Sequence, residues 1–277
     1  MNITEIIKDA FLFPSKNMER FAVYLVLSVL MTVFILGGTL VYPWGFFNVD
    51  NYAIGGIYLV IALVIGFFIS GYHLKVIKSG IELDDEVPVF ELGENFLGGF
   101  EITIISVFYF IIQAFIIAVA VLATNVFGNA IATVQEIRLQ IFNVFFMVNS
   151  ADIAVDAISN AVFNFIISLA ITIAVALIVF LIFSILQSAS QARLANTDSL
   201  KDALDIFEAL KDIKRIGIVK VLLLVLLVLV IIAVMATIFI ILFNYLPLAV
   251  SVIYILLVPY IALAIQRLIG LAYSDIA

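Results

Sequence analysis

The sequence predicts an all-α, polytopic helical membrane protein with six transmembrane helices. Hydrophobic residues make up 66% of its 277 residues and charged residues only 12%, and the mean hydropathy is +1.31, far above that of soluble domains. Six stretches are each long and apolar enough to cross a bilayer core of about 30 Å as a helix. We expect them to form three hairpins, each preceded by a short amphipathic helix on the cytoplasmic side.

The first two spans carry features of a membrane interface and of close helix packing. Pro43 and Trp44 follow the first span, where an aromatic belt is typical. In the second span Ala62, Gly66 and Ser70 recur every fourth residue, and such a row of small residues lets a neighbouring helix approach closely. The six spans run approximately over residues 21–42, 52–74, 100–124, 161–186, 216–243 and 247–273.

The middle of each of the other four spans contains no acidic, basic or histidine side chain. The third and fourth spans carry the amides Gln113 and Asn164. We interpret these side chains as forming hydrogen bonds between helices, and a polar transport path is the alternative. The fifth has no charge from residue 221 to residue 243. The sixth opens with Pro247, which suits a first helical turn because its missing N–H needs no partner there.

The placement of positive charge predicts the orientation in the membrane. Lys and Arg gather on the cytoplasmic side of membrane proteins. Only Arg138 lies opposite the rest, and an odd number of spans would break this segregation. We therefore expect a multi-pass protein of the cell membrane with both termini in the cytoplasm. The other twelve cations are Lys8, Lys16, Arg20, Lys75, Lys78, Arg193, Lys201, Lys211, Lys214, Arg215, Lys220 and Arg267.

We expect one membrane domain over residues 1–277, built of pseudo-repeat units at about 1–80, 87–195 and 197–277. Each unit opens with an amphipathic segment; the three are "EIIKDAF", "PVFELGENFLGGF" and "SLKDALDIFEALKDI". The outer connection, residues 125–160, is expected to lie along the outer membrane surface as a covering segment, with a lid as the alternative. Its apolar face consists of Val134, Ile137, Ile141, Val144 or Phe145, and Val148.

Polar residues at the cytoplasmic ends of the even-numbered spans form the candidate binding cluster. Such a ring could bind lipid head groups or the acidic surface of a partner protein, whereas the alternative is ordinary anchoring of helix ends. The neighbouring acids Glu82, Asp84, Asp85 and Glu86 are interpreted as a solvated turn. The cluster consists of His73, Lys75, Lys78, Gln191, Arg193, Gln266 and Arg267.

The residue inventory favours a protein that is not an enzyme. With no cysteine and one histidine, the chain lacks thiolate chemistry and a histidine-rich metal site, so no metal, cofactor or catalytic residue is assigned. Known nucleophile and phosphate-binding patterns are also missing from the sequence. An intramembrane enzyme acting on lipids would need His73, Glu101 and Tyr72 to meet at one depth.

The stretch from residue 70 to residue 101 resembles a family of multi-pass membrane proteins known only as domain of unknown function four-zero-one-three. The similar features are Gly71 and Tyr72 at a helix end, a basic stretch, an acidic turn with proline, and an amphipathic segment containing Phe and Gly. "QARLANTDSLKDALDIFEALK" and "RLIGLAYSD" are also similar to it. The family pattern usually has arginines at the positions of Lys75 and Lys78. The resemblance implies a polytopic membrane protein and no catalytic residues.

Two functions follow as hypotheses. The first is a non-enzymatic membrane module whose cytoplasmic face engages membrane lipids or a cytoplasmic or membrane partner protein. The second is a permease or the membrane component of a transporter, with "DALDIFEALKDIKRIG" docking onto a cytoplasmic ATPase. Nucleic acid is not expected as a partner, and the sequence leaves the oligomeric state open.

Overall fold

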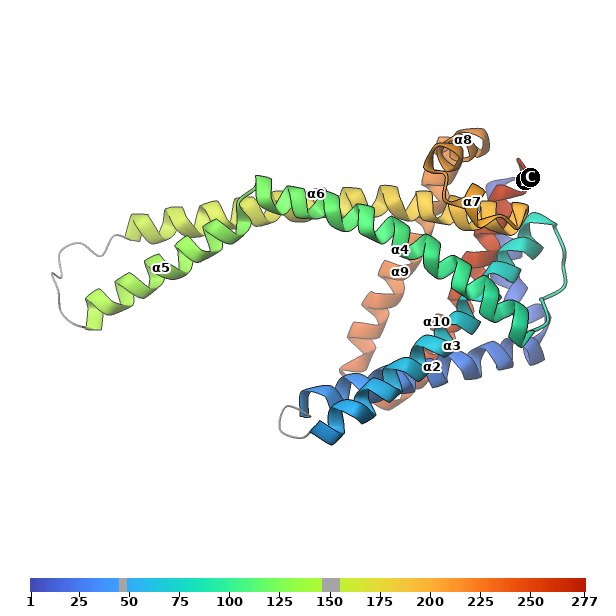
Figure 1. Cartoon of the computed structure of the whole chain (residues 1–277), viewed down its shortest axis with the longest axis horizontal. Coiled ribbons are helices and arrows are strands. Elements are labelled where there is room, and N and C mark those ends of the chain that lie inside the picture. The colour runs from blue at the N-terminus through green and yellow to red at the C-terminus, as the bar shows by residue number, and fades with distance from the viewer. Residues whose placement is uncertain (45–48, 146–154) are drawn as a thin grey trace. The chain divides into compact units, whose positions relative to one another are not determined.

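The computed structural model describes residues 1–44, 49–145 and 155–277 (Figure 1). Every regular element in these ranges is a helix, which confirms the all-α class. The elements are α1 (Ile3–Leu12), η1 (Phe13–Lys16), α2 (Met18–Trp44), α3 (Val49–Ile81), α4 (Leu92–Ala123), α5 (Val126–Phe145), α6 (Val155–Thr197), α7 (Leu200–Ala203), α8 (Ile206–Ile216), α9 (Ile218–Phe243) and α10 (Pro247–Tyr273).

Six helices are long and apolar enough to cross a membrane, as the sequence predicts: α2, α3, α4, α6, α9 and α10. Large apolar side chains such as Phe115 and Leu122 are exposed on them, which is the surface that a lipid-facing helix presents. The chain is therefore a multi-pass membrane protein. Three of these helices continue past their predicted ends, α2 to Trp44, α3 to Ile81 and α6 to Thr197.

The second amphipathic segment differs from the prediction. The sequence predicts a separate short helix for this segment, but α4 begins at Leu92 and continues to Ala123 without a break. Its glycines allow close packing instead of ending the helix. A Cβ on Gly99 would overlap the carbonyl of Phe67, and a Cβ on Gly71 would overlap the carbonyl of Asn95, so α3 and α4 cross backbone to backbone.

The described chain divides into two compact units. Unit 1 consists of residues 1–107 and 185–277, and unit 2 consists of residues 108–184. The helices α4 and α6 contribute residues to both. The predicted repeat of three hairpin units stays a prediction.

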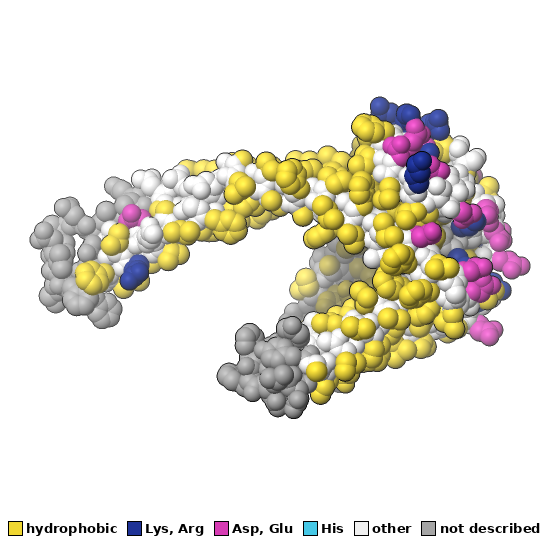
Figure 2. Space-filling model, in the orientation of Figure 1, with side chains coloured by type: hydrophobic (Ala, Val, Ile, Leu, Met, Phe, Trp, Pro, Cys, Tyr) yellow, Lys and Arg dark blue, Asp and Glu magenta, His cyan; other side chains and the backbone are white. Residues whose placement is uncertain are grey.

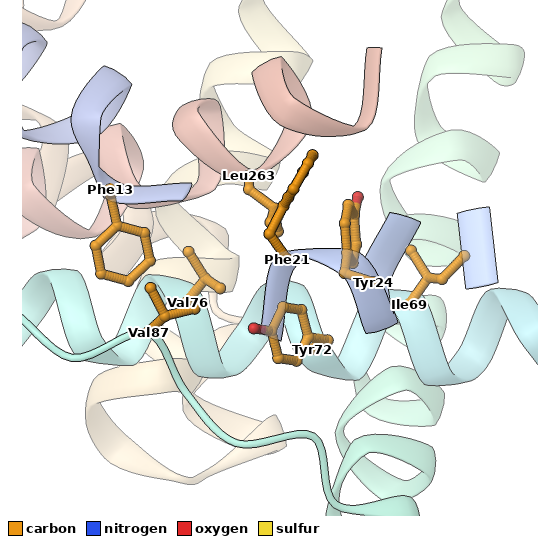
Figure 3. Close-up of a cluster of buried hydrophobic side chains, with 8 residues drawn as sticks. All are labelled: Phe13, Phe21, Tyr24, Ile69, Tyr72, Val76, Val87 and Leu263. Carbon is orange, nitrogen blue, oxygen red and sulfur yellow. The ribbon is translucent and has the colours of Figure 1, made fainter. Parts of the chain in front are cut away.

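The main core of unit 1 joins η1 and α2 to α3, α10 and the loop after α3 (Figure 3). Tyr24 stacks on Tyr72 with ring centroids 5.6 Å apart, and Phe21 meets Tyr260 edge-on at 5.6 Å. Aromatic pairs in these geometries stabilise a core beyond the area they bury. The buried members are Phe13, Phe21, Tyr24, Ile69, Tyr72, Val76, Val87 and Leu263.

Two further clusters fasten α10 within unit 1. One joins it to α1 and α9 through Ile6, Leu224 and Leu271, and the other joins it to α3 and α6 around Tyr273. The helices α3 and α10 also approach closely, because a Cβ on Gly80 would lie 2.9 Å from the Cα of Gly270. The last helix, α10, therefore packs against α1, α3, α6 and α9 within unit 1.

Unit 2 contains α5 with the adjoining parts of α4 and α6. Thr124 and Thr172 share a hydrogen bond of 2.7 Å between their hydroxyls, and the Thr133 hydroxyl donates to the carbonyl of Ala161 at 3.0 Å. Within the predicted outer segment, Val134, Ile137 and Ile141 are exposed on α5. Residues 146–154, including Val148, lie outside the described residues. The placement of this segment on the outer surface stays a prediction.

Candidate functional site

A charged cleft of about 620 Å³ opens at one end of unit 1, between the ends of α3 and α4. Figure 2 shows the charged side chains of this unit gathered over α8 and the loop after α3, whereas hydrophobic side chains cover most of the rest of its visible face. The ionisable residues that line the charged cleft are Arg20, Lys75, Lys78, Glu82, Asp84, Glu86, Glu94, Glu101 and Asp198.

Two lysines of the predicted cluster lie one helical turn apart on α3 and line the cleft. Lys75 Nζ lies 2.8 Å from a carboxylate oxygen of Glu91 and 2.7 Å from one of Glu94, across the cleft on the α4 side. Lys78 Nζ donates to both carboxylate oxygens of Asp198, each at 2.9 Å. These ion pairs join α3 to the start of α4 and to the end of α6.

The acidic turn after α3 is fixed at one edge of the cleft by two cations. Lys16 Nζ lies 2.7 Å from Asp85 and 3.2 Å from Asp9, and Arg20 donates to the carbonyl of Val87. Partial burial opposes the charge on Lys16, but the two carboxylates outweigh it and raise the pKa of Lys16. Lys16 in turn lowers the pKa of Asp85. The turn stays exposed to solvent, as the sequence interpretation expects, while these contacts tie it to η1 and α2.

Arg267 is fully buried and lies outside the cleft lining. One guanidinium nitrogen donates to the carbonyl of Asp84 at 2.7 Å and to the hydroxyl of Ser79 at 3.2 Å. The other donates to Asp9 at 3.3 Å, while the guanidinium lies over the ring of Phe13. Arg267 thus ties α10 to α1, η1, α3 and the acidic turn. Its positive charge pairs with Asp9 inside the protein.

Arg193 belongs to a second network, around the carboxylate of Asp212. Arg193 Nη1 lies 2.7 Å from the carboxylate oxygen that also accepts a hydrogen bond from the Tyr273 hydroxyl at 2.6 Å. Asp212 is buried, so these two donors satisfy a carboxylate that would be costly to bury alone. The network joins α6, α8 and α10.

The histidine and the two amides of the predicted cluster are half-buried. His73 Nε2 lies 2.7 Å from the Tyr24 hydroxyl on α2. The Tyr72 hydroxyl instead donates to the carbonyl of Pro88, and Glu101 lines the charged cleft. The structure therefore gives His73, Tyr72 and Glu101 different surroundings. Gln266 Oε1 has no hydrogen-bond partner among the described residues.

The predicted cluster is thus divided among several environments. Lys75 and Lys78 lie together in the cleft, whereas Arg193 and Arg267 each bind a carboxylate elsewhere. In the predicted packing row, Ala62 is buried, and a Cβ on Gly66 would lie 3.7 Å from the sulfur of Met31 on α2. The roles of both sets in binding and packing stay predictions.

Sequence reasoning missed the carboxylates that anchor the arginines. Asp212 shares the inward face of α8 with Ala209 and Ile216, at spacings of three and four residues. The position of Asp212 at the helical spacing of inward-facing residues could have indicated a buried carboxylate. Asp9 gave no comparable signal, because its partner Arg267 is 258 positions away. Within the described residues, no group of three acidic or histidine side chains is placed to hold a metal ion.

The comparisons with known proteins agree with the predicted resemblance. A family model described as "Protein of unknown function (DUF4013)" matches residues 54–244, which is more than half of the chain. The match includes the residues that line the charged cleft, except Arg20, and it includes α8. Neither the curated proteins nor the solved structures contain a match.

Proposed function

The chain belongs to the DUF4013 family of proteins of unknown function, and on that premise we propose a non-enzymatic membrane module whose cytoplasmic face engages membrane lipids. A partner protein is the competing occupant of the same face. Both termini lie in the cytoplasm under this proposal, because twelve of the 13 Lys and Arg residues share that side.

The observation that carries the proposal is the outer face of α8. Phe207 is 76% exposed, and the exposed Leu210, Lys211, Lys214 and Arg215 lie on the same side of the helix. The opposite side is packed on unit 1 through Ala209 and Asp212. The exposed face therefore combines a large aromatic ring with three cations.

The position of α8 supports a contact between this face and the membrane surface. Only Gly217, at φ 105°, separates α8 from the membrane-spanning helix α9. A helix at that level with apolar and basic side chains on one face is suited to anionic head groups, with the ring inserted below them. Each cation near such a surface contributes about 1 kcal/mol to binding. The ion pair between the part-buried Arg193 and the buried Asp212 holds the inner side in place.

Fluorescence of a single tryptophan tests the contact with lipid. Trp44 is the only tryptophan of the chain, so Trp44→Phe combined with Phe207→Trp places one reporter on α8. In reconstituted vesicles of anionic lipid we expect blue-shifted emission that brominated lipids quench. Lys211→Gln with Lys214→Gln should weaken the quenching, whereas the matched pair Lys8→Gln with Lys201→Gln should not. Water-like emission without quenching would point to a partner protein instead.

Cysteine labelling tests the orientation separately. The chain contains no cysteine, so Lys201→Cys and Glu136→Cys each create a single reactive site. In intact cells a membrane-impermeant maleimide should label the Glu136→Cys protein and leave the Lys201→Cys protein unlabelled until the membrane is opened. The reverse pattern would place α8 outside the cell.

A further inference from the structure

We propose that the charged cleft binds a zwitterionic ligand that carries a phosphate group and a primary ammonium group a short distance apart. The cleft volume of about 620 Å³ lies within the roughly 300–1,000 Å³ range of small-molecule sites. Charges of both signs face it from different elements. This site is distinct from the outer face of α8, which is not part of its lining.

Lys75 and Lys78 supply the phosphate side. Their side chains are 22% and 39% exposed, whereas those of their partners Glu91, Glu94 and Asp198 are 52%, 70% and 71% exposed. Ion pairs with such solvated carboxylates contribute little stability. A phosphate can therefore replace these partners at small cost, while the two ammonium groups keep their positions.

Glu101 supplies the ammonium side. It is half-buried on α4, lines the cleft and makes no ion pair with the described residues. The lining holds three cations and six carboxylates, so the cleft has an excess of negative charge. That excess disfavours a ligand that is only anionic and attracts a cationic group. The two sides together select a ligand with both charges.

The apolar part of the lining sets the depth of the ligand. Leu74 and Leu97 face the cleft from the ends of two membrane-spanning helices, together with Val89 from the loop. A glycerol backbone can pack against these side chains while the charged groups reach Lys75 and Glu101. This inference rests on the proposed function in one respect, the placement of this end of the helices at head-group depth. The fluorescence of the Phe207→Trp protein tests the proposed function separately.

Native mass spectrometry of the full chain in detergent tests the site. With added phosphatidylethanolamine we expect one retained lipid per chain, and weaker retention of phosphatidylcholine and phosphatidylglycerol. Glu101→Gln and Lys78→Gln should each lower retention by about tenfold, as expected for loss of one charge-assisted hydrogen bond. Glu136→Gln, which alters a carboxylate on α5 in unit 2, is the matched control and should retain lipid as the wild type does.

Soluble glycerophosphoethanolamine distinguishes the two sources of the ligand. If it displaces the lipid and binds as tightly, the ligand is a soluble compound with this head group; if the lipid binds more tightly, the ligand is a lipid. Both results support the chemistry of the cleft. Equal retention by the Glu101→Gln protein, or retention of phosphatidylglycerol as strong as that of phosphatidylethanolamine, would overturn the proposal.

Discussion

The guanidinium carbon of Arg267 lies 4.4 Å from the centre of the Phe13 ring. The same group donates to Asp9 and to the carbonyl of Asp84. Stacking on a ring while donating in several directions requires a planar guanidinium, which lysine cannot replace. We expect Arg267→Lys to lower the free energy of unfolding by about 2–3 kcal/mol, because charge-assisted hydrogen bonds are lost. Thermal unfolding in detergent measures the change.

Arg215→Lys is the matched control for this substitution. Arg215 is 63% exposed and lies 3.7 Å from Asp212, so the replacement keeps a solvated charge. Its unfolding should match that of the wild type. If Arg267→Lys were equally stable, the guanidinium contacts of Arg267 would not hold the elements together.

Close packing at the α3–α4 crossing makes Gly99 intolerant of a side chain. A Cβ there would overlap the backbone of Phe67, so Gly99→Ala must push the two helices apart. We expect a loss of about 1–3 kcal/mol, the usual cost of overpacking. Gly93→Ala is the control, because nothing lies within 4 Å of its Cβ position and alanine favours the helix. Equal unfolding temperatures for both variants would contradict this packing.

The shared carboxylate of Asp212 fastens α8 to α10. Tyr273→Phe removes one of its two donors and should cost about 1 kcal/mol, the net value of a typical hydrogen bond. Asp212→Ala should cost more, because the part-buried Arg193 then loses its closest partner. Tyr245→Phe, at an exposed position, should have no effect. Hydrogen exchange of the α8 amides, measured by mass spectrometry, should be faster in the first two variants only.

Acid should remove the stabilisation that Asp275 provides. Burial alone would raise the pKa of Asp275, but Lys220 and the N-terminal ammonium of Met1 together outweigh this effect and hold the pKa below its ordinary value of about 3.9. Because the folded-state pKa is the lower one, the stabilisation is present above about pH 4 and disappears as the pH falls through the folded-state value.

The comparison with Asp275→Asn tests this pH dependence. The wild type should unfold at a higher temperature than the variant at pH 7 and at pH 5, and the difference should shrink at pH 3. Asp202→Asn, which changes an exposed acid of α7, should show no such convergence. A difference between wild type and Asp275→Asn that stays constant down to pH 3 would argue against the contacts of Asp275 with Lys220 and the N-terminus.

The six membrane-spanning helices could be predicted because long apolar stretches must satisfy their backbone hydrogen bonds internally, whatever they pack against. The glycines of α4 could not be interpreted in the same way. Gly98 and Gly99 lie at the end of the segment predicted as a short amphipathic helix, and only the partner backbone of α3 shows that they allow a close crossing. Helix packing depends on which faces meet, and a hydropathy pattern does not contain that information.

The charged residues show the same limit. Lys75, Lys78, Arg193 and Arg267 are alike in sequence, since each follows the apolar part of a span. The structure separates them by their partners: two line an open cleft with exposed carboxylates, and two pair with Asp212 and Asp9 at least 19 positions away. Whether a cation is available to a ligand is decided by these distant carboxylates.

The contacts of Arg267 also set an order of events during synthesis. Asp9 emerges from the ribosome 258 residues before the guanidinium that it binds, and the acidic turn emerges 183 residues before it. Until α10 has entered the membrane, α1 and this turn lack the contact with Arg267. The contacts that join α10 to α1 and to the acidic turn can therefore form only when the sixth span is in place, which makes them a late step in the biogenesis of the protein.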